Sequence, residues 1–129
     1  MAVVELTKDN FEEVVSNNGF VIVDFWAPWC GPCRSFAPTY EKVSEDHPDI
    51  VFAKVNTEDE QEIAAHFQIR SIPTLMIFRD KIIIFSEAGA MPESGFRQLV
   101  GKAGELDMDE VRRQIADSES GQSSDQGQA

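Results

Sequence analysis

The sequence predicts an α/β fold with a central mixed β-sheet of about five strands, flanked by about four helices. Short apolar segments rich in β-branched residues alternate with segments of helical periodicity over most of the chain. The 129 residues, of which 42% are hydrophobic, are enough for one domain with its own core. Because strands and helices alternate, we expect helices on both faces of the sheet.

Five segments have the pattern of strands. Residues 20–26, FVIVDFW, are apolar at nearly every position, which is typical of a central strand buried on both faces. Only Asp80 and Lys81 separate the last two apolar segments, which predicts a hairpin whose turn type stays open because the turn lacks glycine. The expected strands are residues 3–6, 20–26, 50–56, 74–79 and 82–86.

Four segments predict helices, because their apolar residues fall on one face. Thr7 is a candidate N-cap for the first of them. A segment carrying Pro38 follows the cysteine pair and predicts the second helix. The expected helices are residues 7–17, 33–46, 61–67 and 94–102.

The C-terminal part of the chain extends beyond this alternating pattern. Asp107 and Glu110 resemble a capping box, which predicts an extra helix within residues 105–117. From residue 118 the sequence SESGQSSDQGQA has no large apolar side chain, so we expect a disordered acidic and polar tail over residues 118–129. The remaining residues, 1–104, form the expected main domain.

The formal net charge of −12 limits the partners of this protein. It argues against nucleic-acid binding, which needs Lys and Arg at the phosphates, and against docking on anionic membranes. No apolar stretch approaches a membrane span, and the N-terminus does not resemble a signal peptide. We expect a cytoplasmic monomer whose charge either keeps it soluble or steers it toward a basic face of a partner.

Cys30 and Cys33 are the only cysteines, and two residues separate them. A disulfide across so short a loop removes little entropy from the unfolded chain, which favours chemistry over stapling. In a reducing compartment such a pair is redox-active or binds metal. Zinc prefers two close pairs of ligands, and the two histidines, His47 and His66, lack that spacing, so we expect no metal.

The first cysteine of the pair is expected at the N-terminus of a helix. Free backbone N–H groups and the helix dipole favour an anion there, so we expect a lowered pKa for Cys30 and a nucleophilic role. Cys33 lies one turn further in and would attack the mixed disulfide to release the substrate. Gly31 and Pro32 stiffen the turn and leave little bulk over the Cys30 sulfur.

Asp24 is the only charged residue of the apolar segment 20–26. An unpaired carboxylate in a buried strand is costly, and desolvation raises its pKa. We hypothesise that Asp24 moves protons to and from Cys33, directly or through water. Lys54, on the expected neighbouring strand, is a candidate partner for Asp24, although a lysine at this position is also compatible with simple solvation.

The block VDFWAPWCGPCRSFAP around the two cysteines resembles the active-site signature of the thioredoxin family. The segment RSIPT, residues 70–74, is similar to the cis-proline loop of that family, and Gly89 in SEAGAMP matches a third loop. The resemblance covers residues 3–102 approximately. It implies a thioredoxin fold, here with a C-terminal extension.

The resemblance also implies roles for individual residues. Cys30 would attack, Cys33 would resolve, and Asp24 would be the buried carboxylate beside Lys54. Pro73 would be cis and lie against the disulfide, and the Ile72 backbone would pair with an extended substrate segment. The implied substrate-binding surface consists of Trp29, Gly31, Pro32, Ile72, Pro73, Gly89 and Ala90.

The function implied by the resemblance is thiol–disulfide exchange that reduces protein disulfides. The redox-active disulfide would be the only redox group, and a thioredoxin reductase drawing on NADPH would recycle it. The Gly-Pro dipeptide between the cysteines resembles the reducing members. Two alternatives stay open: a disulfide oxidant or isomerase, and a non-catalytic binding subunit that uses the same surface for docking.

Overall fold

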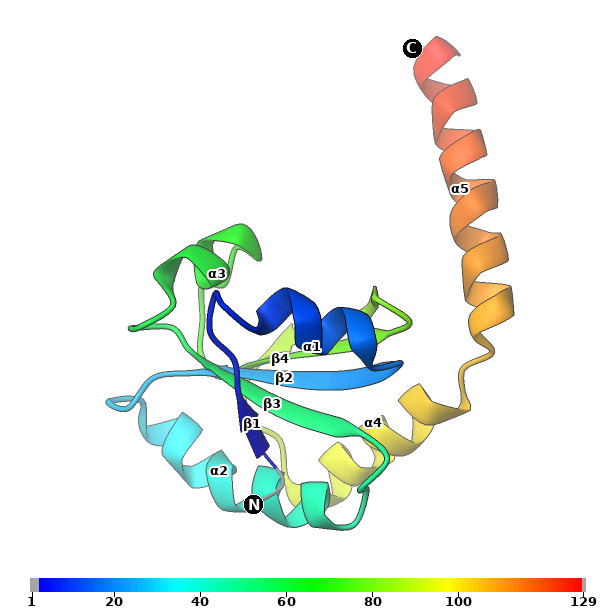
Figure 1. Ribbon diagram of the computed structural model, residues 1–129. Coiled ribbons are helices and arrows are strands. Elements are labelled where there is room, and N and C mark those ends of the chain that lie inside the picture. Colours follow the sequence, from blue (N-terminus) through cyan, green and yellow to red (C-terminus); the bar gives the residue numbers. More distant parts are fainter. Residues whose placement is uncertain (1–2, 129) are drawn as a thin grey trace.

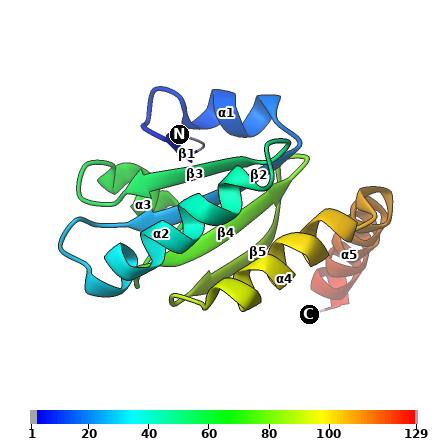
Figure 2. The same ribbon diagram turned by 90° about the horizontal axis from the view of Figure 1, so that it is seen from below.

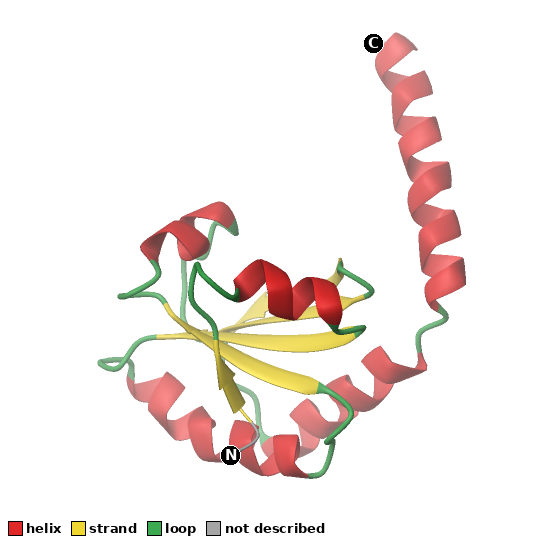
Figure 3. Cartoon of the chain, viewed as in Figure 1, coloured by secondary structure: helices red, strands yellow, loops and turns green. Residues whose placement is uncertain are grey.

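The computed structural model describes the backbone of residues 3–128 and the side chains of residues 3–119. Its strands are β1 (Val3–Glu5), β2 (Phe20–Trp26), β3 (Val51–Asn56), β4 (Thr74–Arg79) and β5 (Ile82–Ala88). Its helices are α1 (Phe11–Asn17), α2 (Gly31–Glu45), α3 (Gln61–His66), α4 (Glu93–Glu105) and α5 (Met108–Gln128). The expected α/β fold with a mixed sheet is confirmed (Figure 3).

The five strands form one sheet in the order β1-β3-β2-β4-β5 (Figure 1). The β1–β3 and β3–β2 pairs are parallel, and the β2–β4 and β4–β5 pairs are antiparallel. β2 therefore lies at the centre, and its residues from Val21 to Phe25 are all buried, as its sequence predicts. The helices cover both faces: α2 and α4 lie on one side, and α1 and α3 lie on the other (Figures 1 and 2).

Alternation along β2 divides the apolar core into two layers. Ile22 points into the layer under α2 and α4, where it joins Phe36 and Phe96. Val21, on the opposite parity, points into the layer under α1 and α3, which includes Val15. A sheet buried on both faces fixes the register of β2, because a slip by one residue would move every side chain to the wrong layer.

One local expectation needs correction, and one turn type that the sequence left open is now defined. Thr7 does not cap α1: the helix begins at Phe11, Asn10 is its N-cap, and the Thr7 carbonyl accepts the Phe11 N–H at 2.9 Å. The β4–β5 turn needs no glycine, since Asp80 and Lys81 adopt φ angles of 52° and 71°. Positive φ at both central residues is the pattern of a type I′ turn, whose twist suits a hairpin.

The C-terminal extension forms α5, which runs away from the domain (Figure 1). Asp107 caps it as expected: its carboxyl accepts the N–H groups of Asp109 at 3.0 Å and Glu110 at 3.2 Å. The structure continues the helix to Gln128, through most of the segment for which the composition predicts disorder. The disorder of residues 118–128 in solution stays a prediction, and residue 129 lies outside the described residues. Among residues 3–128, no helix is both long and apolar enough to cross a membrane.

Candidate redox site

The cysteine pair lies where β2 leads into α2. Cys30 is the N-cap residue of α2, and its sulfur accepts the Cys33 N–H at 3.2 Å. The two residues form a disulfide with a Cα–Cα distance of 5.3 Å. Both are buried, with 4% of Cys30 and 2% of Cys33 exposed. The short loop after β2 and the helical turn of α2 therefore hold the two sulfurs together at the edge of the domain.

The loop before β4 lies against this disulfide. The Ile72–Pro73 peptide bond is cis, and the Ile72 carbonyl oxygen lies 3.8 Å from the Cys30 sulfur. This loop follows Cys30 by some forty residues, yet it lies beside it because β4 pairs antiparallel with β2. The start of β4 is thus adjacent to the end of β2, from which the cysteine turn leaves.

A third loop completes this surface. Gly89 donates its N–H to the Pro73 carbonyl at 2.8 Å and adopts a φ of 111°. A Cβ at Gly89 would meet nothing within 4 Å, so the requirement for glycine is conformational rather than steric. The bond ties the loop after β5 to the cis-proline loop.

The residues expected to contact a substrate form a mostly exposed surface beside the sulfurs. Trp29 stands out, with 66% of its surface exposed. Ile72 is half-buried and packs against the cysteines, whereas Pro73 is buried. The exposed members of the set are Trp29, Gly31, Pro32, Gly89 and Ala90.

Asp24 lies behind the disulfide in the middle of β2. Only 4% of its surface is exposed, and its Oδ1 has no hydrogen-bond partner. Burial raises the pKa of Asp24 to about 7, and the positive charge of Lys54 offsets part of that rise. The expectation of a desolvated carboxyl with a raised pKa is therefore met by the structure.

Lys54 is the residue opposite Asp24 in the parallel β2–β3 register. Among the described residues, however, Asp24 has no cationic partner within ion-pair distance. The Lys54 ammonium lies instead 4.9 Å from the ring centroid of Trp26. The Trp26 ring thus holds the Lys54 ammonium near the Asp24 carboxyl through a cation–π contact. The ammonium does not form an ion pair that would neutralise the carboxylate.

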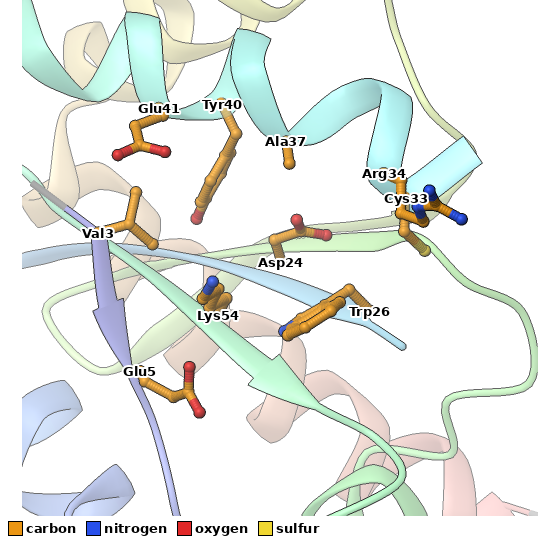
Figure 4. A pocket seen from close by; sticks show the side chains of 10 residues that line it. All are labelled: Val3, Glu5, Asp24, Trp26, Cys33, Arg34, Ala37, Tyr40, Glu41 and Lys54. Atoms are coloured by element: carbon orange, nitrogen blue, oxygen red, sulfur yellow. The ribbon is translucent and has the colours of Figure 1, made fainter. Parts of the chain in front are cut away.

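A cavity of about 300 Å³ connects these groups (Figure 4). It lies between α2 and the strands β1, β2 and β3, and both Asp24 and Cys33 line it. Its other lining residues are Val3, Glu5, Trp26, Arg34, Ala37, Tyr40, Glu41 and Lys54. A space of this size beside the Asp24 carboxyl and the Lys54 ammonium has room for water, which can carry a proton between the carboxyl and the inner sulfur.

Tyr40 is a site residue that the sequence reasoning missed. It is 2% exposed and reaches from α2 to the sheet, where its hydroxyl donates to the Ala53 carbonyl at 2.6 Å and lies 2.9 Å from the Ile22 carbonyl. Burial raises its pKa well above the usual range, and the Asp24 charge raises it further. The signal in the sequence was a tyrosine on the apolar face of the helix, seven residues after Cys33.

Within residues 3–128, no group of three or more His, Cys, Asp or Glu side chains is arranged to hold a metal ion. The reactive pair that the structure brings together at this site is the Cys30–Cys33 disulfide. A disulfide within the first turn of a helix can open and close without moving the backbone far. This arrangement places the protein in the class of thiol–disulfide oxidoreductases.

Sequence comparison identifies the family within that class. The family model Thioredoxin matches residues 2–102, and the chain belongs to the thioredoxin family. It is 54% identical over 114 residues to “Putative thioredoxin 2” of Streptomyces coelicolor, which covers 88% of this chain and 85% of that relative. It is 36% identical over 103 residues to thioredoxin of Bacillus subtilis, covering 79% and 98% of the two chains.

Solved structures show the same relationship. The oxidised thioredoxin of Plasmodium falciparum superposes with a TM-score of 0.71 at 34% identity, covering 78% of this chain and 97% of that one. A mutant thioredoxin of Halobacterium salinarum gives a TM-score of 0.75 at 29% identity, covering 81% and 93%. The fold is thus that of these thioredoxins, and the close cysteine pair is consistent with a disulfide oxidoreductase.

Proposed function

We propose that this protein reduces disulfides in other proteins, with Cys30 as the nucleophile and Cys33 as the resolving cysteine. The observation that carries the proposal is the position of Cys30 at the N-cap of α2, where its sulfur accepts the Cys33 N–H. A backbone donor and the positive end of a helix stabilise a thiolate, which is the attacking form. Cys33, behind it, is the residue placed to complete the exchange.

The proposed reaction needs only the substrate disulfide, the two cysteines and one carboxylate. The Cys30 thiolate attacks a substrate sulfur, a mixed disulfide forms, and the first substrate thiolate leaves. Cys33 then gives its thiol proton to Asp24, and the resulting thiolate attacks the Cys30 sulfur. The Cys30–Cys33 bond forms, the second substrate thiolate leaves, and two electrons have passed to the substrate.

Asp24 suits the proton-transfer role. A group with a pKa of about 7 has both protonation states available near neutral pH, which is the condition for general acid–base catalysis. The shared cavity supports a route from Cys33 to the carboxyl through water. Lys54, held over Trp26, keeps a positive charge near the carboxyl without an ion pair.

Substrate binding would use the exposed surface around the sulfurs. The Pro73 carbonyl is already occupied by Gly89, whereas the Ile72 carbonyl faces Cys30. We propose that an extended substrate segment pairs with the Ile72 backbone as an added strand. The surrounding contacts would come from Trp29, Gly31, Pro32, Ile72, Pro73, Gly89 and Ala90.

Membership of the thioredoxin family supports the remaining steps. The oxidised protein would be returned to the dithiol by a thioredoxin reductase that draws on NADPH, in the cytoplasm. The alternative of a disulfide oxidant differs in the direction of electron flow, which the reduction potential decides.

Three experiments test the proposal. Cys33→Ser should trap substrates as mixed disulfides through Cys30, whereas the matched Cys30→Ser variant should trap none. Equilibration of the protein with glutathione gives its reduction potential; a value near that of strong oxidants, about −120 mV, would reverse the proposed direction. A double Cys→Ser variant that still binds its partners would favour a docking role.

A further inference from the structure

The cavity behind the disulfide has three exposed lining residues, Glu5, Arg34 and Ala37, and none of them belongs to the proposed substrate surface. Glu5 and Ala37, together with the half-buried Val3 and Glu41, bound the part of the cavity between β1 and α2. We call these four residues the mouth of the cavity. They come from β1 and α2, and none of the proposed substrate contacts is among the residues that line the cavity.

We propose that Asp24 exchanges its proton with solvent through this mouth, between β1 and α2, while a substrate segment covers the disulfide. The inference rests on the proposed role of Asp24 as the proton carrier for Cys33. It adds the path that the proton takes to solvent and the residues that surround this path. Figure 4 shows the carboxyl between the Ala37 and Tyr40 side chains of α2 and the Lys54 side chain of β3.

Burial limits the ways in which Asp24 can exchange a proton with solvent. Asp24 is 4% and Cys33 is 2% exposed even without a substrate, and a docked segment would cover the sulfurs further. The carboxyl takes up one proton from Cys33 in each turnover and must return it before the next. A route that stays open in the docked complex allows this return without dissociation of the substrate.

The cavity has the room and the polar groups to hold a chain of water molecules. A buried water needs roughly 10–15 Å³ of accessible volume, and this cavity offers about 300 Å³. Asp24 Oδ1 and Trp26 Nε1 are both buried without a protein partner. Buried polar atoms of this kind are usually satisfied by water.

The charged groups along the route come from three elements. Lys54 faces the carboxyl from β3, Arg34 and Glu41 line the cavity from α2, and Glu5 lies opposite Lys54 in the β1–β3 register. Tyr40 keeps its own proton, because burial raises its pKa well above the usual range. In the release step the Asp24 O–H bond breaks, water accepts the proton, and no electrons move.

The test closes the mouth with a bulky side chain. The Ala37 Cβ points toward Asp24 in Figure 4, so Ala37→Phe would fill the opening. Glu45→Phe is the matched control, since residue 45 is exposed on the same helix and outside the cavity. The measurement is the single-turnover rate of the resolving step between pH 6 and 9, with Asp24→Asn alongside.

We expect Ala37→Phe to slow the resolving step about tenfold near neutral pH, a part of what positioned proton transfer contributes. Its pH profile should also move to higher pH, because a drier cavity raises the pKa of Asp24 further. Glu45→Phe should keep the rate and the profile of the parent protein. Circular dichroism checks that each variant folds.

A second variant closes the same mouth from the other side. Glu5→Phe on β1 should slow the step as Ala37→Phe does, whereas Glu45→Phe, the same exchange outside the cavity, should not; this pair decides the matter if Ala37→Phe fails to fold. If folded plugged variants match the parent protein while Asp24→Asn is slow, the route is wrong. If Asp24→Asn is itself as fast as the parent, the proposed role of Asp24 fails instead.

Discussion

At the redox end of the sheet, Asp24 keeps a buried carboxyl oxygen without a hydrogen-bond partner, and the Trp26 indole nitrogen is likewise buried and unpartnered. At the hairpin end, the Asp80 carboxyl and the Arg79 guanidinium both have partners, although Arg79 Nε is itself buried without one. Arg112 of α5 bonds the Asp80 carboxyl at 2.8 Å, and Arg79 donates to the Ala103 carbonyl at 2.5 Å near the end of α4. Both ends belong to the same sheet, and β4 runs from one to the other.

The difference between the two ends follows from what each does. A buried polar group without a partner costs about 1–3 kcal/mol, and at the redox end the group that bears this cost is a titratable carboxyl. At the hairpin end it is a single nitrogen of Arg79, whose guanidinium still bonds the Ala103 carbonyl. The Asp80–Arg112 ion pair and the buried Met108 hold the start of α5 against the domain, away from the disulfide.

The strongest test of this comparison is a loss of activity at one end alone. Cys30→Ser should lower the rate of disulfide reduction by ~10³-fold or more, because a serine hydroxyl is not ionised at neutral pH. Asp80→Asn, at the hairpin end, should leave that rate unchanged. The measurement is reduction of insulin disulfides, and an equal loss in both variants would show that the ends are not independent.

Asp24 should also make the stability of the fold depend on pH. Its pKa is about 7 in the folded protein, against about 3.9 in an unfolded chain, so only the folded state holds this proton between those values. The stabilisation of the fold by this bound proton is fully present below pH ~4 and is lost as pH rises to 7. The loss in the free energy of unfolding is on the order of 4 kcal/mol.

Asp24→Asn should remove this dependence and stabilise the protein at pH 8 far more than at pH 4. Denaturant unfolding at the two pH values measures the effect, with Asp80→Asn as the control that keeps the parent slope. If the free energy of unfolding of Asp24→Asn changed between pH 4 and pH 8 as much as that of the parent protein, the carboxyl would be ionised in the folded state at pH 8 at no cost in stability. The contrast between the two ends would then disappear.

Much of the redox end could be predicted from the sequence. The apolar run around Asp24 placed it in a buried central strand, and the order strand, tight turn, helix placed Cys30 at a helix start. The cavity and the position of Lys54 over Trp26 could not be predicted, because they depend on how α2 and β1 pack on the sheet. Side-chain contacts between distant elements leave no local pattern.

The hairpin end was predicted less completely. No local pattern indicated that Asp80 would take a positive φ and also pair with Arg112, thirty-two residues later. Periodicity and the Asp107 cap indicated the start of α5, and the disorder that composition predicts from residue 118 stays a prediction.

Met108 is the main apolar anchor of the extension, with 6% of its surface exposed. Met108→Ala should weaken the docking of α5 by about 2 kcal/mol, the low end of the range for a buried methionine, because a peripheral site collapses easily. Amide hydrogen exchange should rise in α5 and stay unchanged in β2. Ile115→Ala, at a residue 38% exposed, is the control that should change neither.

The smallest effect should come from the ion pair itself. Asp80 and Arg112 are 41% and 48% exposed at their side chains, and Arg112 also bonds Asp109, which can retain it when Asp80 is removed. A double-mutant cycle of Asp80→Asn and Arg112→Gln should therefore show a coupling of only two- to fivefold, roughly, in the docking equilibrium of α5. The coupling should vanish at 1 M salt, where charges are screened within about 3 Å. A larger coupling that survives salt would mean that the hairpin end depends on a water-excluded polar contact, as the redox end does.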